Sequence, residues 1–253
     1  SLMLGGAFLI DESQKDATSA KLEDSIVNKV SEIRYYNGQS SILSDGNLLR
    51  TSAFQPNEEV ALKIVMEKPT SLYLKGFVGS QYTASTWQQA DTASYLQHKP
   101  LLDALKREQF TSSQQLYLAA ETGLGEQATA NMTIQNINAS SRYFYIPYEL
   151  AVLKNETIKT TDYTMLESSK FFGDRSYQLT YMDTAVNDYP KIASSLYTLN
   201  VAPYLNYESY YNQYVYEQFL QLPADTKALL LHHVGEEFNE VEHLSYEQAI
   251  EMV

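Results

Sequence analysis

The chain has 253 residues, of which 44% are hydrophobic and 19% are charged, and it contains 10 glycines and 7 prolines. This composition excludes a disordered, collagen-like or low-complexity chain, and the length allows one large domain or two small ones with a sizeable core. The 31 acidic and 18 basic residues give a net charge of −13. A nucleic-acid-binding protein needs a basic surface, so we expect no nucleic-acid partner.

Cysteine is absent, and 21 tyrosines stand beside 9 phenylalanines and 1 tryptophan. Without cysteine there are no thiol nucleophiles, thiolate metal sites or disulfides. An acidic, tyrosine-rich and cysteine-free composition favours an exported protein. No segment reaches the roughly 18 apolar residues that cross a bilayer, and the apolar residues 1–10 lack the basic region and cleavage site of a signal peptide.

The first predicted elements are a helix and two strands. In residues 14–36 apolar side chains recur every three or four positions, which predicts an amphipathic helix docked on a domain. Residues 59–68 alternate apolar and polar side chains as a half-buried strand does, and residues 72–78 predict a second strand. The turn residues between them predict a hairpin, followed by a loop over 79–87.

Helical patterns return in residues 91–122, with a cap at Thr111 to Ser113 and terminating glycines after the second helix. Strands are predicted at 131–136, 142–147 and 176–182. Helices are predicted at 190–199, 206–222 and about 225–238, and a last helix begins near Ser245.

This order contains no β-α-β alternation, so we predict an α+β protein: an antiparallel β-sandwich-like sheet with an inserted helical pair and C-terminal helices. We expect an N-terminal segment at 1–43 and a β-rich domain at 44–200, with its helical insertion at about 91–122. A helical linker would occupy 201–253. Because the last helical pattern is interrupted at Val253, we expect the sequence to belong to a longer protein.

The best metal-ligating candidate lies near the C-terminus. His232 and Glu236, and likewise His233 and Glu237, are four residues apart on a helix, and His243 follows. This pattern differs from H-E-x-x-H, which places two histidines on one face with a glutamate between them. An exposed helix with His–Glu contacts is therefore the preferred interpretation, and we expect no metal.

Other catalytic patterns are weak. A glycosidase needs two carboxylates about 5–10 Å apart, which sequence spacing does not establish. The chain contains neither a G-x-S-x-G elbow nor a phosphate-binding glycine loop, and His98 beside Lys99-Pro100 is predicted to lie in a loop. We therefore expect no catalytic residue and no cofactor.

Aromatic residues offer a different kind of site, because tyrosine and tryptophan faces stack on sugar rings. The candidates on the predicted strands and loop are Tyr73, Tyr82 and Trp87, and a possible aromatic binding surface is formed by Tyr143, Tyr145 and Tyr148. Aromatic residues on strands also commonly fill a hydrophobic core. These tyrosines and Trp87 are therefore either core residues or a binding surface.

Residues 71–87, S-L-Y-L-K-G-F-V-G-S-Q-Y-T-A-S-T-W, carry a more specific pattern. They resemble a stretch that precedes the catalytic domain in bacterial membrane proteins of the transglutaminase-like superfamily, of the cysteine-protease type. Residues 136–150, 211–223 and 244–253 are similar to later segments of that family. The matching positions of the first stretch are Leu72, Tyr73, Leu74, Lys75, Gly76, Gly79, Tyr82, Thr83 and Trp87.

The resemblance implies a non-catalytic ectodomain module on the extracytoplasmic face of a membrane-anchored parent. In the family a Cys–His–Asp triad lies downstream, and no triad residue can be assigned to a chain without cysteine. The module would position the downstream catalytic domain or a cell-wall or surface-protein substrate.

Within this reading, Gly76 and Gly79 would permit turns, and Tyr82 and Trp87 would anchor a loop. The linker helix would pack on the sandwich through Tyr211, Tyr214 and Phe219. Two alternatives remain open: a binding module for cell-wall glycan or peptide, and a self-contained hydrolase with paired carboxylates.

Overall fold

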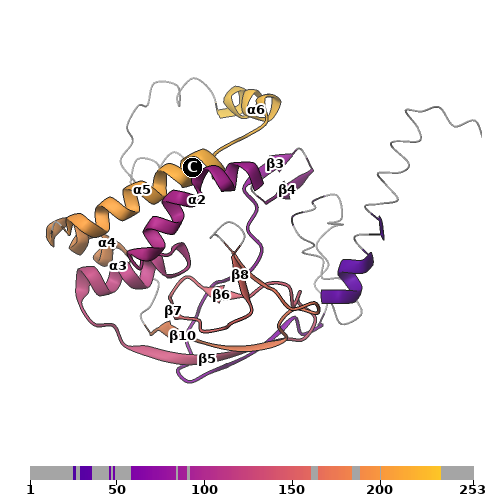
Figure 1. Ribbon diagram of the computed structural model, residues 1–253, viewed down its shortest axis with the longest axis horizontal. Coiled ribbons are helices and arrows are strands. Elements are labelled where there is room, and N and C mark those ends of the chain that lie inside the picture. The colour runs from indigo at the N-terminus through magenta and orange to yellow at the C-terminus, as the bar shows by residue number, and fades with distance from the viewer. Residues whose placement is uncertain are drawn as a thin grey trace, which may run out of the picture.

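The computed structural model has one antiparallel sheet of four strands, three two-stranded sheets and a group of helices beside them (Figure 1). The residues that it describes are 25–26, 29–35, 46, 48, 58–83, 85–89, 92–160, 165–183, 189–199 and 201–234.

The four-stranded sheet has the order β1-β5-β10-β7. Its long central strands pair in register from Ser176 opposite Gln135 to Met182 opposite Thr129. Both alternate buried and exposed side chains, as strands with one face on a core do. The strands are β1 (Leu62–Met66), β5 (Thr129–Asn136), β10 (Ser176–Met182) and β7 (Leu150–Val152).

The small sheets are antiparallel pairs of two or three residues per strand. They are β2 (Leu74–Lys75) with β6 (Ile146–Pro147), β3 (Gln81–Thr83) with β4 (Thr86–Gln88), and β8 (Ile158–Thr160) with β9 (Leu166–Ser168).

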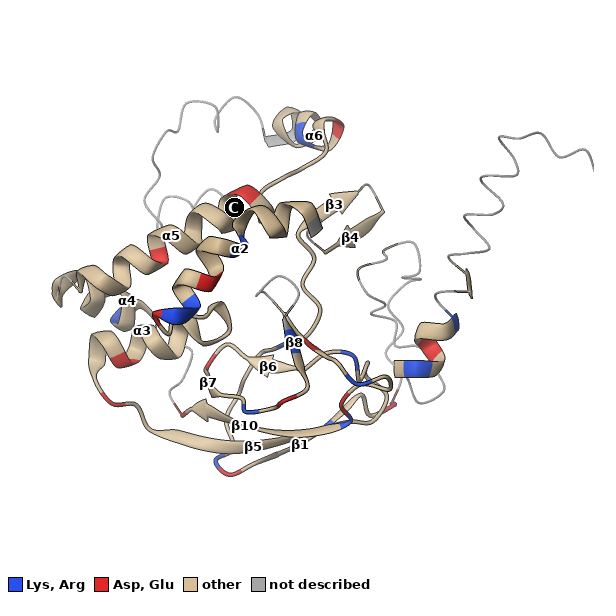
Figure 2. Ribbon diagram, viewed as in Figure 1, with Lys and Arg blue, Asp and Glu red and all other residues tan. Residues whose placement is uncertain are grey.

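The helices gather on one side of the strands (Figure 1). They are α2 (Thr92–Arg107), the short 3-10 helix η2 (Ser112–Gln114), α3 (Gln115–Leu124), α4 (Tyr189–Leu199), α5 (Ala202–Phe219) and α6 (Ala224–Val234). Basic and acidic positions are interspersed along the ribbon (Figure 2). Among the described helices, none combines the length and the apolar character that crossing a membrane requires.

Two hydrophobic cores hold these elements. The sheet core is built from the buried faces of β5 and β10 with Phe144, Ile146 and Leu150. The helical core joins α2, α3, α4 and α5 and also takes in Met182 from the end of β10. The helices predicted as an insertion and the first helix of the predicted linker therefore share one core.

The α+β class and the antiparallel strands are confirmed. The strand predicted at 176–182 is present with the predicted ends. The strand predicted at 131–136 and the helices predicted at 190–199 and 206–222 are present with shifted ends. Of residues 142–147, only Ile146 and Pro147 form a strand, while Tyr143 makes an isolated bridge. The sheets are small and not closed, so a sandwich-like arrangement stays a prediction.

The predicted hairpin between residues 59–68 and 72–78 is wrong. β1 pairs with β5, and β2 pairs with β6, so the two strands join different sheets. Alternation shows that a segment is extended, but the partner is selected by burial against residues distant in sequence. The actual hairpin, β3–β4, lies in the segment predicted as a loop.

The end of the predicted N-terminal amphipathic helix contacts the strand part of the chain, but the described apolar residues do not dock on it. Residues 25–26 and 29–35 are helical, but Ile26, Val30 and Ile33 are exposed. This part is held instead at its end, where the Arg34 side chain donates to the Phe171 carbonyl oxygen at 2.9 Å. The rest of this predicted helix lies outside the described residues, as does the helix predicted from Ser245.

Candidate binding groove

A groove of about 610 Å³ lies where α3, α4 and α5 meet the turn between β6 and β7. We call it the tyrosine groove. Four tyrosines from three parts of the chain line it, together with apolar side chains of the helices and a polar rim. The tyrosines are Tyr148, Tyr189, Tyr197 and Tyr211, and the rim consists of Lys75, Ser112, Ser113, Gln115, Glu208 and Asn212.

The walls follow from the amphipathic pattern of the helices. On α4, Ile192 and Leu196 are four residues apart and both are buried. The helix α3 approaches them closely at Gly123, where an added Cβ would lie 3.3 Å from Leu196 Cγ. On α5, Pro203 lies in the first turn, where its fixed φ suits a helix start. The floor of the groove therefore includes the core side chains Ile192, Leu196 and Tyr211.

The polar rim is held by hydrogen bonds between helices. The Gln115 amide donates to Glu208 Oε1 at 2.9 Å, which ties α3 to α5. The Tyr204 hydroxyl donates to the Gln115 carbonyl oxygen at 3.2 Å. Across the groove, the Lys75 ammonium lies 5.6 Å from the centre of the Tyr148 ring, a cation–π contact. The rim therefore offers amide, carboxylate and ammonium groups at fixed places.

A buried carboxyl group lies behind the groove. Glu149 is fully buried, and its Oε1 accepts a hydrogen bond of 3.4 Å from Tyr189, whose side chain lines the groove. Among the described residues, Glu149 Oε2 has no hydrogen-bond partner. Burial raises the pKa of Glu149 above its usual range, and burial with the neighbouring Glu149 raises the pKa of Tyr189 to about 12. Burial therefore shifts the protonation equilibrium of both groups toward the neutral form.

Two of the groove tyrosines have exposed side chains, and the Lys75 ammonium lies over one face of the Tyr148 ring. Tyr148 is 51% exposed and Tyr197 is 73% exposed, whereas Tyr211 is buried. An exposed aromatic face beside hydrogen-bonding groups can hold a ligand that has both an apolar face and polar edges.

The three predicted surface tyrosines are not brought together. Tyr143 is buried with its ring against the edge of Phe77, so it offers no face to a ligand. Tyr145 is half-buried, and its ring occupies the space beside Gly76. Tyr148 is exposed and belongs to the groove.

The stretch of residues 72–87 that resembles the transglutaminase-like family, called here the motif, mainly packs aromatic rings. Tyr82 and Trp87 face each other across the β3–β4 hairpin with ring centres 5.2 Å apart, and the Thr83 and Thr86 hydroxyls lie 2.5 Å apart. The Trp87 amide also donates to the Gly46 carbonyl oxygen at 2.8 Å. Tyr73 is 73% exposed, while its neighbours in the motif, Leu72 and Leu74, are half-buried.

The predicted role of the motif glycines as turn residues is wrong. Neither Gly76 nor Gly79 has a positive φ. Instead, an added Cβ would lie 2.6 Å from the Tyr145 ring at Gly76 and 2.6 Å from Trp87 Cβ at Gly79. Both positions need glycine because an aromatic side chain approaches the backbone closely.

The aromatic residues of α5 pack on helices and not on a sandwich. Tyr211 and Tyr214 belong to the helical core, and Phe219 packs against it. The Tyr214 ring lies 5.3 Å from the His98 ring of α2 and 6.0 Å from the Phe219 ring.

His98 lies within α2, so its predicted place in a loop is wrong. The helix continues through Pro100, although proline removes one helical hydrogen bond. His98 Nδ1 is 3.0 Å from the Ser94 carbonyl oxygen, and Nε2 is 2.8 Å from Glu217 Oε2 of α5. Both nitrogens therefore face acceptors, and the histidine joins two helices.

The predicted metal candidates are mostly outside the described residues. His232 lies on α6, the side chain of His233 is not described, and Glu236, Glu237 and His243 fall beyond the described part. In the part of the chain that the structure describes, no group of three or more histidine, aspartate or glutamate side chains could hold a metal ion.

Sequence reasoning missed Glu149, Tyr189 and Tyr197. The helical spacing of Tyr189, Ile192 and Leu196 marks a face of α4, but nothing in that spacing indicates what the face meets. The groove forms only when three segments distant in sequence come together.

These features define an α+β protein with a tyrosine-lined groove between its helices and the edge of its strands. In comparisons with protein-family models, with curated proteins and with solved structures, the chain matches none of them.

Proposed function

We propose that this chain is a binding module that takes a cell-wall glycan into the tyrosine groove. The observation that carries the proposal is the pairing of exposed tyrosine faces with short polar side chains on one concave surface. A sugar ring has an apolar C–H face and a hydroxyl edge, so it needs both kinds of surface. Tyr148 and Tyr197 would stack on the ring, while Gln115, Glu208 and Asn212 would bind its hydroxyls.

The size of the groove suits a short glycan segment. Its volume of about 610 Å³ lies within the roughly 300–1,000 Å³ that is usual for small-ligand pockets, which suits one or two sugar residues. A longer glycan would extend out of the open groove over its exposed tyrosines.

The test is a titration of the isotope-labelled chain with N-acetylglucosamine-containing oligosaccharides, followed by NMR. An aromatic contact contributes about 0.5–1.5 kcal/mol beyond its buried area, so we expect Tyr148→Ala or Tyr197→Ala to weaken binding by about fivefold or more. Tyr216→Ala is the control, because Tyr216 is 60% exposed on α5 but does not line the groove.

Equal weakening by Tyr216→Ala, or shift changes confined to residues away from the groove, would contradict the proposal. A short peptide added in the same way is the second arm. If only the peptide shifts the groove residues, the glycan proposal fails and the alternative ligand, a peptide, replaces it.

We further propose that the module acts outside the cell membrane, as the non-catalytic part of a membrane-anchored transglutaminase-like protein. The support is the resemblance of residues 71–87 to that family. Sequencing the source gene on both sides tests it. A cysteine, a histidine and an aspartate within about 150 downstream codons, with apolar spans of about 20 residues, would support this context. A stop codon soon after Val253 would contradict it.

A further inference from the structure

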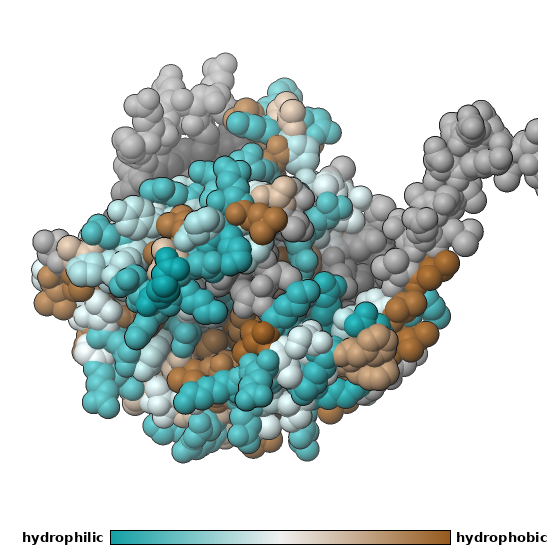
Figure 3. Space-filling model, in the orientation of Figure 1, coloured by the Kyte–Doolittle hydropathy of each residue, from teal (hydrophilic) through white to brown (hydrophobic). Residues whose placement is uncertain are grey.

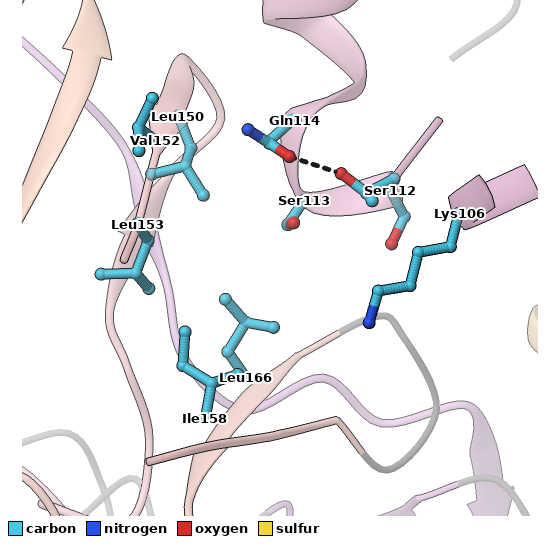
Figure 4. Close-up of a pocket in the computed structure, with 10 residues that line it drawn as sticks. Lys106, Ser112, Ser113, Gln114, Leu150, Val152, Leu153, Ile158 and Leu166 are labelled. Atoms are coloured by element: carbon cyan, nitrogen blue, oxygen red, sulfur yellow. Dashed lines mark hydrogen bonds between the residues drawn. The ribbon is translucent and has the colours of Figure 1, made fainter. Parts of the chain in front are cut away.

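The four-stranded sheet ends at two edge strands, β7 and β1, which differ in their surroundings. At β7, Gln114 Nε2 donates to the Ala151 carbonyl oxygen, and Gln114 Oε1 accepts a hydrogen bond of 2.8 Å from the Thr111 hydroxyl. Figure 4 shows Gln114 beside Leu150 and Val152 of this strand. The η2 turn therefore covers the β7 edge, which is one of the ways in which proteins protect a sheet from further pairing.

The β1 edge turns backbone donors and acceptors outward. Directly after β1, the Glu67 amide donates to the Asn131 carbonyl oxygen of β5 at 2.9 Å. In an antiparallel ladder every second residue bonds the same neighbour, so the backbone groups of Lys63 and Val65 also face β5. The residues between them turn their N–H and C=O groups to the open side, where no described residue bonds them. They are Leu62, Ile64 and Met66.

The side chains of β1 also suit the addition of a strand. Val65 is 58% exposed and Ile64 is 39% exposed, and both are β-branched residues that favour strands. The strand contains neither proline nor glycine, and its register with β5 runs without a bulge. Figure 2 labels β1 at the lower border of the molecule, and Figure 3 shows hydrophobic side chains between hydrophilic ones along that border. An edge with these properties is a template for a further strand.

Lys63 restricts which strand can pair with this edge. A lysine on an edge strand discourages pairing unless the added strand places an opposite charge against it. Glu67 is exposed and lies four residues further along the same extended segment, so both side chains point to the same face of the sheet. The Asn131 side chain donates to Glu67 Oε2 at 3.0 Å, which holds the carboxylate on the exposed face. The segment thus carries both a charge to be matched and its complement.

We propose that a second copy of this chain pairs with β1 in antiparallel orientation, with Val65 on the two-fold axis. Symmetry then fixes every other pair, because each contact in such a dimer occurs twice. Lys63 lies opposite the partner's Glu67, and Ile64 exchanges two hydrogen bonds with the partner's Met66. The two four-stranded sheets become one continuous sheet.

The other symmetric registers lose this charge match. With Ile64 on the axis, Lys63 faces the partner's Val65, and with Lys63 itself on the axis two ammonium groups meet. Because β1 has only five residues, the pairing buries less than the roughly 1,200–2,000 Å² of a standard interface. We therefore expect a weak dimer, with a Kd of about 100 μM.

A single cysteine tests the position of the axis, since the chain has no other thiol. In the proposed dimer Val65 and the partner's Val65 form a close pair with Cβ atoms about 4.5–5.5 Å apart, near the span of a disulfide. We expect mild oxidation to link Val65→Cys into dimers about tenfold faster than Val60→Cys or more. Val60 is the matched control, because it is 56% exposed on the same segment but lies far from the partner's Val60.

Charge variants test the register by sedimentation equilibrium at about 10–500 μM. Lys63 is exposed, so Lys63→Glu should fold. It places two carboxylates opposite each other twice, and we expect it to weaken dimerisation by about fivefold or more. Combining Lys63→Glu with Glu67→Lys restores opposite charges and should return dimerisation to within about twofold of the wild type. Lys154→Glu is the control, because Lys154 is exposed away from β1 and the variant has the same net charge as Lys63→Glu.

Four results would overturn the proposal. They are a monomer over the whole concentration range, equal linking of Val65→Cys and Val60→Cys, equal weakening by Lys154→Glu and Lys63→Glu, and no recovery in the charge exchange. Since no residue of β1 lines the tyrosine groove, failure of glycan binding and failure of this dimer are distinguishable.

Discussion

At the scale of single residues, two buried carboxyl groups have opposite environments. Asp174 Oδ2 accepts hydrogen bonds from Thr157 and Ser168 at 2.6 and 2.5 Å, and Oδ1 pairs with the Lys170 ammonium at 2.5 Å. Burial alone would raise the pKa of Asp174, but Lys170 and the two hydroxyls lower it below its usual value near 3.8. Among the described residues no cation interacts with Glu149, so burial dominates and raises its pKa. Asp174 is therefore held as a carboxylate by its hydrogen-bond donors and Lys170, whereas burial disfavours the charged form of Glu149 next to the groove.

Glu149 predicts a pH dependence of stability. With a raised pKa, the folded chain binds more protons than the unfolded chain. The free energy of unfolding therefore falls as the pH rises from the usual glutamate pKa, near 4.5, through the raised pKa of Glu149 in the folded chain. Glu149→Gln keeps the shape and removes the ionisation, so we expect this fall to disappear. The variant should be at least as stable as the wild type at the upper end of that range.

The measurement is urea denaturation at a series of pH values. Glu126→Gln is the matched control, because Glu126 is exposed and its removal should leave the pH profile of the wild type nearly unchanged. An unaltered profile in Glu149→Gln would show that Glu149 is ionised at no cost in the folded chain and would contradict the prediction.

At the scale of elements, two glycines that both have a positive φ differ in their surroundings. Gly125 follows α3 with φ at 86°, and Gly173 lies between β9 and β10 with φ at 70°. An added Cβ would meet nothing within 4 Å at Gly125, but at Gly173 it would lie 2.0 Å from the Ser141 carbonyl oxygen. At both positions a side chain would be strained by the positive φ, but only at Gly173 would it also collide with the backbone.

Alanine at each position separates the two effects. Gly125→Ala should cost about 1–3 kcal/mol, because φ 86° with ψ −165° lies in a region that is nearly confined to glycine. Gly173→Ala should cost about 3 kcal/mol or more, because the loop before β10 must move away from Ser141. Urea denaturation of the two variants checks this difference. Equal losses would mean that the loop adjusts freely and that the close approach is unimportant.

The elements also show what local pattern can predict. Alternation identified β5 and β10, and helical spacing identified α4 and α5, because both patterns reflect burial of one face. Pairing partners were not predictable, since β1 is separated from its partner β5 by α2 and α3. His98 was misplaced because proline usually breaks a helix, whereas here α2 is held against α5 by Glu217.

At the scale of the whole molecule, the candidate site depends on contacts that no single segment encodes. Tyr148 was recognised as a possible binding residue because it stands in an aromatic cluster of the sequence. Tyr197 was not, because its role depends on α4 lying between α3 and α5. The groove exists only once the helices of the core are assembled. The spacing of apolar residues within one helix therefore does not predict it.

The two cores are physically linked. Met182 extends from β10 into the helical core, and its amide donates to the Glu149 carbonyl oxygen at 2.8 Å. Gln114 ties the η2 turn to β7 through the Ala151 carbonyl oxygen. We therefore expect the helices and the four-stranded sheet to unfold in one transition, as single domains usually do.

Leu196→Ala tests this coupling. Leu196 is 4% exposed in the helical core, so its truncation should cost about 2–4 kcal/mol. Hydrogen exchange should then accelerate in both α5 and β5, although β5 lies in the other core. Leu199→Ala on the same helix is the control, since Leu199 is 59% exposed and should change little. If α5 loses protection while β5 retains it, the helices form a separate folding unit. In that case the tyrosine groove, which lies against the strands at Lys75 and Tyr148, would open without unfolding the sheet.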